Sequence, residues 1–246
     1  MSVAWAGTCA CHAQTFSLYA AASLKESATE IAHAFEKHHP GVSVAINFAG
    51  SQQLAAQIRQ GAPVDVLMSA GMEPLKSIDY AKPSLETFAT NKLALIVPSG
   101  STKLPSIGGL DGSLRLIVAD KSVPVGHYTF ELLAKAEGRF GSKWRSAVER
   151  NVISREQDVR AVLTKIELGE ADAGFVYVTD VATAKGKVQR IPIPEDLNIR
   201  AVYPAVRFTG SANEGLAKEF TRYLLDREAQ RILIRRGFDA PVKPQK

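Results

Sequence analysis

Apolar residues along the first third of the chain recur with the spacing of alternating strands and helices. Residues 16–22 form a short apolar run typical of a strand, and the apolar positions of residues 24–35 fall on one face of a helix. Strand-like residues 42–48 and 64–68 flank a second helix over residues 54–61. This order of strand, helix, strand, helix, strand predicts a parallel sheet covered on both faces.

Strand and helix patterns also alternate through the rest of the chain. Further strands are expected at residues 93–97, 114–119, 173–178 and 199–206, and further helices at 130–136, 159–166, 216–224 and 229–233. The strands over 93–97 and 199–206 flank a self-contained block of strands and helices. We therefore expect an α/β fold of two lobes, joined by two extended hinge strands, with a ligand cleft between the lobes. Lobe I is expected to be discontinuous, over residues 14–91 and 205–246, and lobe II to span residues 92–204.

Residues 1–13, which precede the first strand, read either as the remnant of an export signal or as a tail outside the fold. Cys11-His12-Ala13 has the small-x-small form of a signal cleavage site. The two cysteines of the chain, Cys9 and Cys11, lie in this segment beside His12, and the other histidines show no metal-ligand spacing. We therefore expect no metal site. No apolar run approaches the roughly 18 residues of a membrane-spanning helix.

Composition and charge narrow the classes of function. The chain has 246 residues, of which 46% are hydrophobic and 22% charged, as in ordinary globular proteins. The formal net charge of +5 permits an anionic partner. The basic residues are scattered, without the clustered face typical of nucleic-acid binding, so no nucleic acid is expected. Two cysteines exclude a disulfide-stabilised scaffold.

Several strand-to-helix junctions carry the polar residues that begin helices. Ser23 is followed three residues later by Glu26, which is the spacing of a capping box, and Ser51 follows Gly50 where it can cap the next helix. Each junction alone is typical of a helix cap. Several junctions converging on one cleft would bind an oxyanion through free N–H groups and helix dipoles, without Lys or Arg. Tyr177, at the end of an apolar strand, fits either the core or the cleft.

Motifs of catalysis are absent from the sequence. It contains no Gly-x-Ser-x-Gly elbow, no His-Glu-x-x-His and no P-loop, and neither Ser23 nor Ser51 has an obvious base nearby in sequence. We therefore expect no enzyme activity. An enzyme on the same scaffold stays an alternative, because one fold serves many functions.

Longer motifs at these junctions resemble a known family. They are AAASLKESATEIAHAFEK at 20–37, FAGSQQLAAQIRQGAPVDVLMSA at 48–70, SVPVGHYTFELL at 122–133 and DVRAVLTKIELGEADAGFVYVTD at 158–180. In this combination the sequence resembles the periplasmic molybdate-binding proteins of ABC importers, which are type II solute-binding proteins. The resemblance implies the two-lobe type II periplasmic binding protein fold, molybdate or tungstate as ligand and no cofactor. It also implies delivery to a membrane permease, a periplasmic location and a monomer.

The resemblance further implies which residues bind the oxyanion. They are the hydroxyl and backbone groups of Ser23 and Ser51, the backbone N–H groups of Val125 and Val159, and the hydroxyl of Tyr177. Molybdate at neutral pH is a dianion without a proton, so a site made only of hydrogen-bond donors suits it. Sulfate carries the same charge but is smaller, so cavity size is expected to reject it.

Four positions leave the choice of ligand open. Val125 stands where many members of the family have Ala, and it could narrow the pocket. Gln52 and Gln53 replace smaller residues and could alter access or selectivity. Arg160 would clamp a carboxylate if it pointed into the cleft, and would otherwise face solvent or brace the hinge. The same fold binding another small anion, such as sulfate or a carboxylate, is therefore the main alternative.

Overall fold

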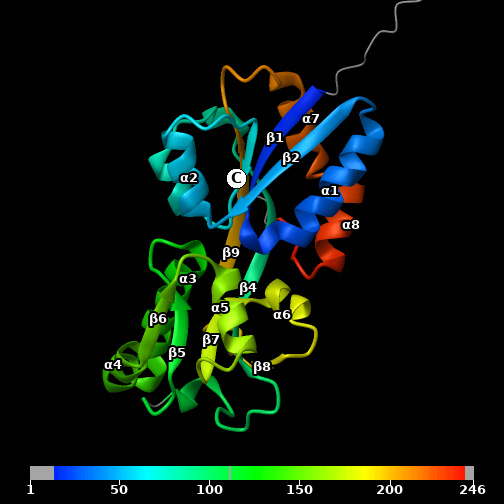
Figure 1. The fold of residues 1–246 in the computed structure, drawn as a ribbon. Helices are drawn as coiled ribbons and strands as arrows, with labels where there is room; N and C mark the ends of the chain where they lie inside the picture. The colour runs from blue at the N-terminus through cyan, green and yellow to red at the C-terminus, as the bar shows by residue number, and fades with distance from the viewer. Residues whose placement is uncertain (1–13, 111, 242–246) are drawn as a thin grey trace, which may run out of the picture.

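A computed structural model describes residues 14–110 and 112–241, which Figure 1 shows as two groups of strands and helices. The strands are β1 (Gln14–Ala21), β2 (Val42–Ala49), β3 (Val66–Met68), β4 (Glu86–Pro98), β5 (Leu116–Ala119), β6 (Val152–Glu156), β7 (Ala173–Tyr177), β8 (Val188–Ile191) and β9 (Arg200–Arg207). The helices are α1 (Lys25–His38), α2 (Ser51–Arg59), α3 (Pro124–Phe140), α4 (Ser142–Arg150), α5 (Val159–Glu167), α6 (Val178–Thr183), α7 (Glu214–Tyr223) and α8 (Arg227–Arg235). The first lobe holds β1–β3 with α1, α2, α7 and α8, and the second lobe holds β5–β8 with α3–α6.

The described strands pair in the order β2-β1-β3-β9-β4-β7-β5-β6, with β8 paired to β4. β1 is parallel to β2 and β3, and β5 is parallel to β6 and β7, as strands joined through helices require. β9 is antiparallel to β3, and β4 is antiparallel to both β9 and β7. The parallel pattern predicted from the first five elements is confirmed for β1–β3. The sheet as a whole is mixed, because the chain crosses between the lobes in both directions.

β4 and β9 join the two lobes, and Figure 1 shows them side by side at the centre of the molecule. Residues 86–92 of β4 pair with β9, whereas residues 93–98 pair with β7 and β8. The two-lobe α/β architecture with two extended connecting strands is thereby confirmed. The predicted start of the first connecting strand at residue 93 is wrong, because β4 begins at Glu86 and its buried polar residues interrupt the apolar pattern. The exact lobe boundaries stay a prediction.

The apolar pattern does not predict α4, β6 or α6. Only Trp144 and Val148 are buried among the nine residues of α4, so its sequence offers too few apolar positions to indicate a helix. β6 is mostly half-exposed, and α6 follows β7 directly without a loop. These elements depend on tertiary packing, which the spacing of apolar residues along the sequence does not indicate.

Two predicted helix caps are not formed. α1 begins at Lys25 after a 3-10 turn, and no side chain bonds to its first N–H groups, so the predicted Ser23–Glu26 capping box is wrong. α2 begins at Ser51 itself, and Gly50 before it is the N-cap residue, so Ser51 does not cap this helix. Both serine hydroxyls are therefore left for contacts outside their own helices.

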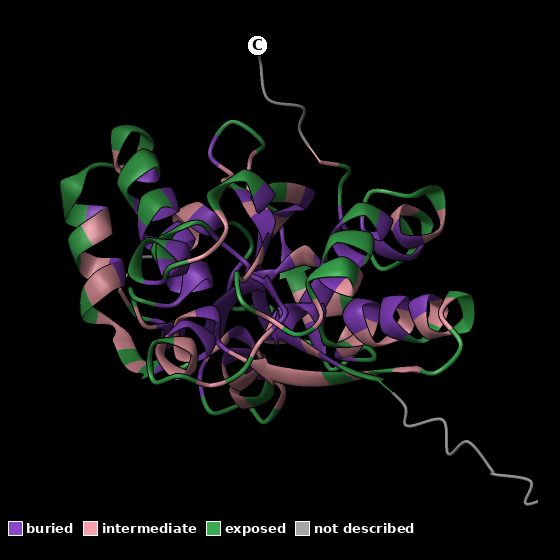
Figure 2. Ribbon diagram, turned by 90° about the horizontal axis from the view of Figure 1, so that it is seen from above, coloured by how far each residue is buried: buried purple, intermediate pink, exposed green. Residues whose placement is uncertain are grey.

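The hydrophobic core follows the strands of both lobes. Figure 2 shows buried residues along the strands and on the inner faces of the helices, with exposed residues on the outer faces. Phe16, Phe35 and Phe220 pack together in the first lobe, and Phe175 is fully buried in the second. Burial of each such side chain stabilises the fold by roughly 1.5–3 kcal/mol. The strands that lead to the junction of the lobes are thus fixed by core packing, and so are the residues at their ends.

Candidate functional site

One small cavity between the lobes brings together all five residues expected to bind the ligand. Ser23 and Ser51 reach it from the first lobe, and Val125, Val159 and Tyr177 reach it from the second. Each of the five is at most 4% exposed. Figure 1 shows the elements that carry them facing one another, with α2 above α3 and α5. The cavity volume is about 20 Å³, and its lining consists of Ala21, Ala22, Ser23, Gly50, Ser51, Ala70, Val123, Pro124, Val125, Asp158, Val159 and Tyr177.

Three helices begin at this cavity. α2 starts at Ser51, α3 at Pro124 and α5 at Val159. The first N–H groups of a helix have no partner within it. Because Pro124 has no N–H, Val125 presents the first N–H group of α3. The positive ends of three helix dipoles therefore meet at one small volume, which favours an anion there.

Two glycines allow close backbone packing at these helix starts. A Cβ on Gly126 would lie 2.0 Å from the carbonyl oxygen of Asp120, so only glycine fits the turn that leads into α3. A Cβ on Gly50 would lie 2.6 Å from the carbonyl oxygen of Gln157, a residue of the other lobe. The backbones of the two lobes therefore approach each other directly beside the cavity.

The Ser51 and Tyr177 hydroxyls both contact the backbone of Ala70. Ser51 Oγ accepts a hydrogen bond from the Ala70 N–H at 3.0 Å. A hydroxyl has one proton besides its acceptor positions, so Ser51 keeps its proton for a ligand in the cavity. The Tyr177 hydroxyl donates to the Ala70 carbonyl oxygen at 3.4 Å, a long bond that a charged acceptor can displace.

The Ser23 hydroxyl is oriented by a buried network behind the cavity. Ser23 Oγ lies 3.1 Å from the hydroxyl of Tyr203. The side-chain amide of Asn91 donates to this tyrosine hydroxyl at 3.4 Å and to Thr179 Oγ1 at 2.9 Å. Because Asn91 occupies an acceptor position of Tyr203, the tyrosine proton is available to Ser23. Ser23 can then direct its own proton into the cavity.

Electrostatically, the cavity lining combines neutral donors with one carboxylate, that of Asp158. Burial raises the pKa of Tyr177 and of Tyr203 well above the usual range, so both hydroxyls stay protonated at neutral pH. The lining contains no Lys or Arg. Its carboxylate, Asp158, accepts hydrogen bonds from the N–H groups of Arg160 and Ala161 at 2.8 and 3.0 Å, as the cap of α5. This arrangement suits a small anion that carries no proton.

Arg160 lies outside the cavity and links the lobes. Its Nη2 lies 2.5 Å from Glu26 Oε2 of the first lobe. Within its own lobe, its Nη1 donates to Thr183 Oγ1 at 2.9 Å, and its Nε lies 3.0 Å from Oδ1 of the buried Asp180. Of the roles expected for Arg160, the geometry matches the brace and not the carboxylate clamp.

Gln52 and Gln53 also lie outside the cavity lining. Gln52 Nε2 donates across the lobes to the Gln157 carbonyl oxygen at 2.7 Å. Gln53 Oε1 accepts from the Gly50 N–H at 3.0 Å and so holds the start of α2. Gln52 therefore joins the two lobes, and an effect of either residue on selectivity stays a prediction.

The residues that support the site from behind are not found from the sequence. Tyr203 lies within an apolar strand pattern and reads as a core residue. Asn91 reads as the boundary of a strand, although it is fully buried inside β4. A polar residue inside an apolar run is the one sequence signal that points to this network.

The sequence predicts neither a metal site nor a membrane-spanning helix. Within residues 14–110 and 112–241, no three His, Cys, Asp or Glu side chains gather as a metal site. Cys9, Cys11 and His12, and with them the expected export-signal remnant, lie outside the described residues. Of the helices that the structure describes, none combines the length and the hydropathy needed to cross a membrane.

The chain is similar to bacterial solute-binding proteins in sequence and in fold. Residues 16–239 match the family model described as bacterial extracellular solute-binding protein. The molybdate-binding protein ModA of Mycobacterium tuberculosis H37Rv is 34% identical over 236 residues, which cover 93% of this chain and 86% of that protein.

Two solved structures share the architecture. The periplasmic molybdate-binding protein of Azotobacter vinelandii gives a TM-score of 0.78 at 22% identity, over 94% of this chain and 100% of that chain. The sulfate-binding protein SubI of M. tuberculosis H37Rv gives a TM-score of 0.82 at 18% identity, over 94% of this chain and 88% of that chain. At these identities the two structures show a common fold, and one fold holds different anions.

Proposed function

Since this chain belongs to the family of bacterial extracellular solute-binding proteins, we propose that its interlobe cavity captures molybdate outside the cytoplasm and delivers it to the membrane permease of an ABC importer. The observation that carries the proposal is the convergence of three helix starts and three buried hydroxyls on one small cavity. The M. tuberculosis relative, which spans nearly the whole chain, is named for molybdate.

The proposed ligand contacts come from both lobes. The hydroxyls of Ser23 and Ser51, with their backbone N–H groups, hold the oxyanion from the first lobe. The Val125 and Val159 N–H groups and the Tyr177 hydroxyl hold it from the second. Hydrogen bonds to a charged ligand contribute roughly 1.5–3 kcal/mol each. Several of them support a complex of micromolar affinity or tighter, after the costs of closure and immobilisation.

Selection among tetrahedral anions follows from protonation and size. Molybdate and tungstate are dianions without a proton at neutral pH, so each accepts from every donor around the cavity. Phosphate retains a proton in part and needs an acceptor, and the one lining carboxylate, Asp158, already uses its Oδ1 as the cap of α5. Sulfate has the right charge but is smaller, so it contacts fewer donors at once. We propose that tungstate binds as molybdate does and that sulfate binds weakly.

The proposed role is transport and not catalysis. The cavity presents donors that hold a ligand, and Arg160, which follows the lining residue Val159, is engaged by carboxylates outside the lining. Molybdenum enters as cargo within the oxyanion, without direct bonds from the protein to the metal and without a resident cofactor. We further propose a periplasmic location and a monomeric receptor that presents the two closed lobes to its permease.

The test is thermal unfolding with and without oxyanions, followed by isothermal titration. A ligand at 100 times its dissociation constant stabilises the folded state by about 2.7 kcal/mol. We expect molybdate and tungstate to raise Tm clearly and phosphate to leave it unchanged. A rise in Tm with sulfate or a small carboxylate, but none with molybdate, would show that the cavity binds another anion.

A further inference from the structure

Both ends of the four-residue segment 157–160 contact the first lobe. At one end, the Gln157 carbonyl oxygen accepts the hydrogen bond from Gln52 at 2.7 Å. At the other end, Arg160 contacts both carboxylate oxygens of Glu26, at 2.5 and 3.3 Å. Val159, between these ends, lines the cavity. The segment is therefore held from outside the cavity at two points and faces the ligand in its middle.

Arg160 is aimed at Glu26 by its own lobe. Its Nε lies 3.0 Å from Asp180 Oδ1, and its Nη1 donates to Thr183 Oγ1 at 2.9 Å. Asp180 is fully buried, and its other oxygen accepts from the Tyr177 N–H at 3.1 Å. The guanidinium is therefore held in place whether or not the first lobe has closed onto it, so its pairing with Glu26 costs little side-chain entropy.

We propose that Glu26 and Gln52 are positioning residues that hold segment 157–160 closed over the bound anion and slow its release, without touching the anion. The inference rests on the proposed function, because it concerns how long the same cavity retains its ligand. Opening the lobes must break the contacts of Glu26, Gln52 and the ligand together. Each lobe-to-lobe contact thus raises the population of the closed state, and the apparent affinity rises with that population.

Partial burial gives these contacts their strength. The side chains of Arg160 and Glu26 are 23% and 35% exposed, so the pair is screened less than one on the open surface. The close approach of Gly50 to the Gln157 carbonyl oxygen leaves no room for a side chain beside the Gln52 contact. The two contacts therefore join the lobes at both ends of the segment whose middle residues, Asp158 and Val159, line the cavity.

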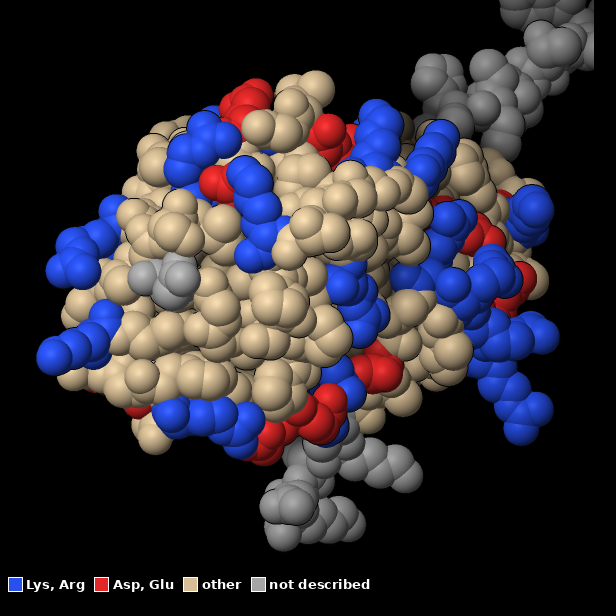
Figure 3. Space-filling model, turned by 90° about the horizontal axis from the view of Figure 1, so that it is seen from below, with Lys and Arg blue, Asp and Glu red and all other residues tan. Residues whose placement is uncertain are grey.

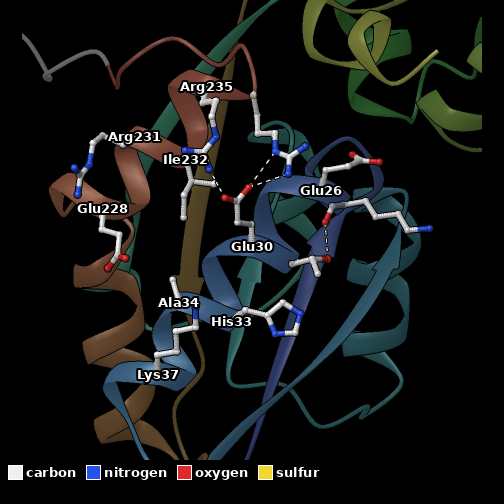
Figure 4. A pocket seen from close by; sticks show the side chains of 12 residues that line it. Glu26, Glu30, His33, Ala34, Lys37, Glu228, Arg231, Ile232 and Arg235 are labelled. Atoms are coloured by element: carbon white, nitrogen blue, oxygen red, sulfur yellow. Dashed lines mark hydrogen bonds and ion pairs between the residues drawn. The ribbon is translucent and has the colours of Figure 1, made fainter. Parts of the chain in front are cut away.

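The first lobe supplies a matched control for each residue. Glu30 lies one turn after Glu26 on α1 and pairs with Arg235, the last residue of α8, and with the following Arg236, entirely within the first lobe. Figure 4 shows the Glu30 carboxylate pointing toward Arg235, with Glu26 nearer the start of the same helix. On α2, Gln57 Oε1 accepts from Asn47 Nδ2 at 2.7 Å, again within the first lobe. Glu30→Gln and Gln57→Ala thus remove similar contacts that do not join the lobes.

The experiment measures molybdate release by stopped-flow chase from the wild-type full chain and from Glu26→Gln, Gln52→Ala, Glu30→Gln and Gln57→Ala. Loss of the Glu26 pair should speed release about fivefold, the effect of an ion pair worth about 1 kcal/mol. Gln52→Ala should speed it by a similar factor, and both control variants should match the wild type. Because the pair is ionic, 1 M salt should speed release from the wild type more than from Glu26→Gln.

Small-angle X-ray scattering of the same chains without ligand separates this inference from the proposed function. Glu26→Gln should be more open on average than Glu30→Gln. If the wild type does not bind molybdate, the proposed function fails, while the scattering still tests the lobe contacts. If Glu26→Gln matches Glu30→Gln in both release and scattering, Glu26 does not hold the lobes closed and the inference is overturned.

Discussion

The Ser23 hydroxyl and the Tyr203 hydroxyl lie 3.1 Å apart, although 180 residues separate them in the chain. Ser23 lines the ligand cavity, whereas Tyr203 lies in β9, one of the two strands that join the lobes. Asn91, in the other connecting strand, donates to the same tyrosine hydroxyl at 3.4 Å. A proposed ligand donor is therefore oriented by the strands about which the lobes meet.

Removal of the Tyr203 hydroxyl should weaken molybdate binding without unfolding the protein. Tyr203→Phe keeps the buried ring but takes away the donor that orients Ser23. We expect affinity to fall about fivefold, as for the loss of one neutral hydrogen bond worth about 1 kcal/mol. Isothermal titration measures the change. Tyr223→Phe is the control, because that hydroxyl donates to Glu228 at 2.8 Å, far from the cavity lining; equal losses in both variants would contradict the orienting role.

Ser51→Ala should affect both binding and stability. The change removes a proposed donor to the anion, and it leaves the Ala70 N–H without the oxygen that accepts from it at 3.0 Å. An unpaired buried N–H costs about 1–3 kcal/mol of unfolding free energy, and a bond to a charged ligand is worth roughly 1.5–3 kcal/mol. Urea denaturation and titration with molybdate measure the two effects. Ser17→Ala is the comparison, since its Oγ donates to the Pro63 carbonyl oxygen at an exposed position of the same lobe. Unchanged molybdate affinity in Ser51→Ala would remove Ser51 from the site.

Val125→Ala should keep molybdate affinity within about threefold, because the proposed donor at this position is the backbone N–H and not the side chain. The smaller side chain enlarges a cavity of about 20 Å³, so discrimination between anions of different size should change more than affinity for molybdate. Parallel titrations with molybdate and the smaller sulfate test this. A tenfold or larger loss for both anions would show that the valine side chain itself shapes the site.

The site could be predicted from the sequence more fully than the residues that support it. Ser23, Ser51 and Val159 stand at strand-to-helix junctions, and such junctions gather where parallel strands end. Each of these positions is marked by a local motif. The convergence of the two lobes on one cavity follows from the order of the strands.

Contacts made by long side chains across the molecule could not be predicted in this way. Arg160 is next to Val159 in the sequence, but its direction depends on the buried Asp180 and on Glu26 of the other lobe. Tyr203 resembles any core aromatic residue until its register in β9 places it behind Ser23. Surface charge misleads in a similar way. Figure 3 shows Lys and Arg side chains gathered on the side where Figure 1 draws α1 and α8, yet none of them lines the cavity.

Asp180 should make the stability of the protein depend on pH between about 4 and 7. Burial raises the pKa of this carboxyl from its ordinary value of 3.8 to about 7, against the opposing effect of Arg160. Between these two values the folded state keeps a proton that the unfolded chain has lost, so rising pH favours unfolding. The contribution of protonated Asp180 to the free energy of unfolding is fully present below about pH 4 and is lost as the pH passes 7. It amounts to roughly 1.4 kcal/mol for each unit by which folding raises the pKa.

Asp180→Asn separates this group from the other carboxyls of the protein. Hydrogen bonds lower the pKa values of Asp120 and Asp172, so these groups lose their stabilising effect at the acid end and not between pH 4 and 7. The asparagine variant cannot titrate, so its unfolding free energy should fall less between pH 4.5 and 7.5 than that of the wild type. Urea denaturation at a series of pH values measures both slopes. Parallel curves would mean that Asp180 is ionised throughout this range, with Arg160 outweighing the effect of burial.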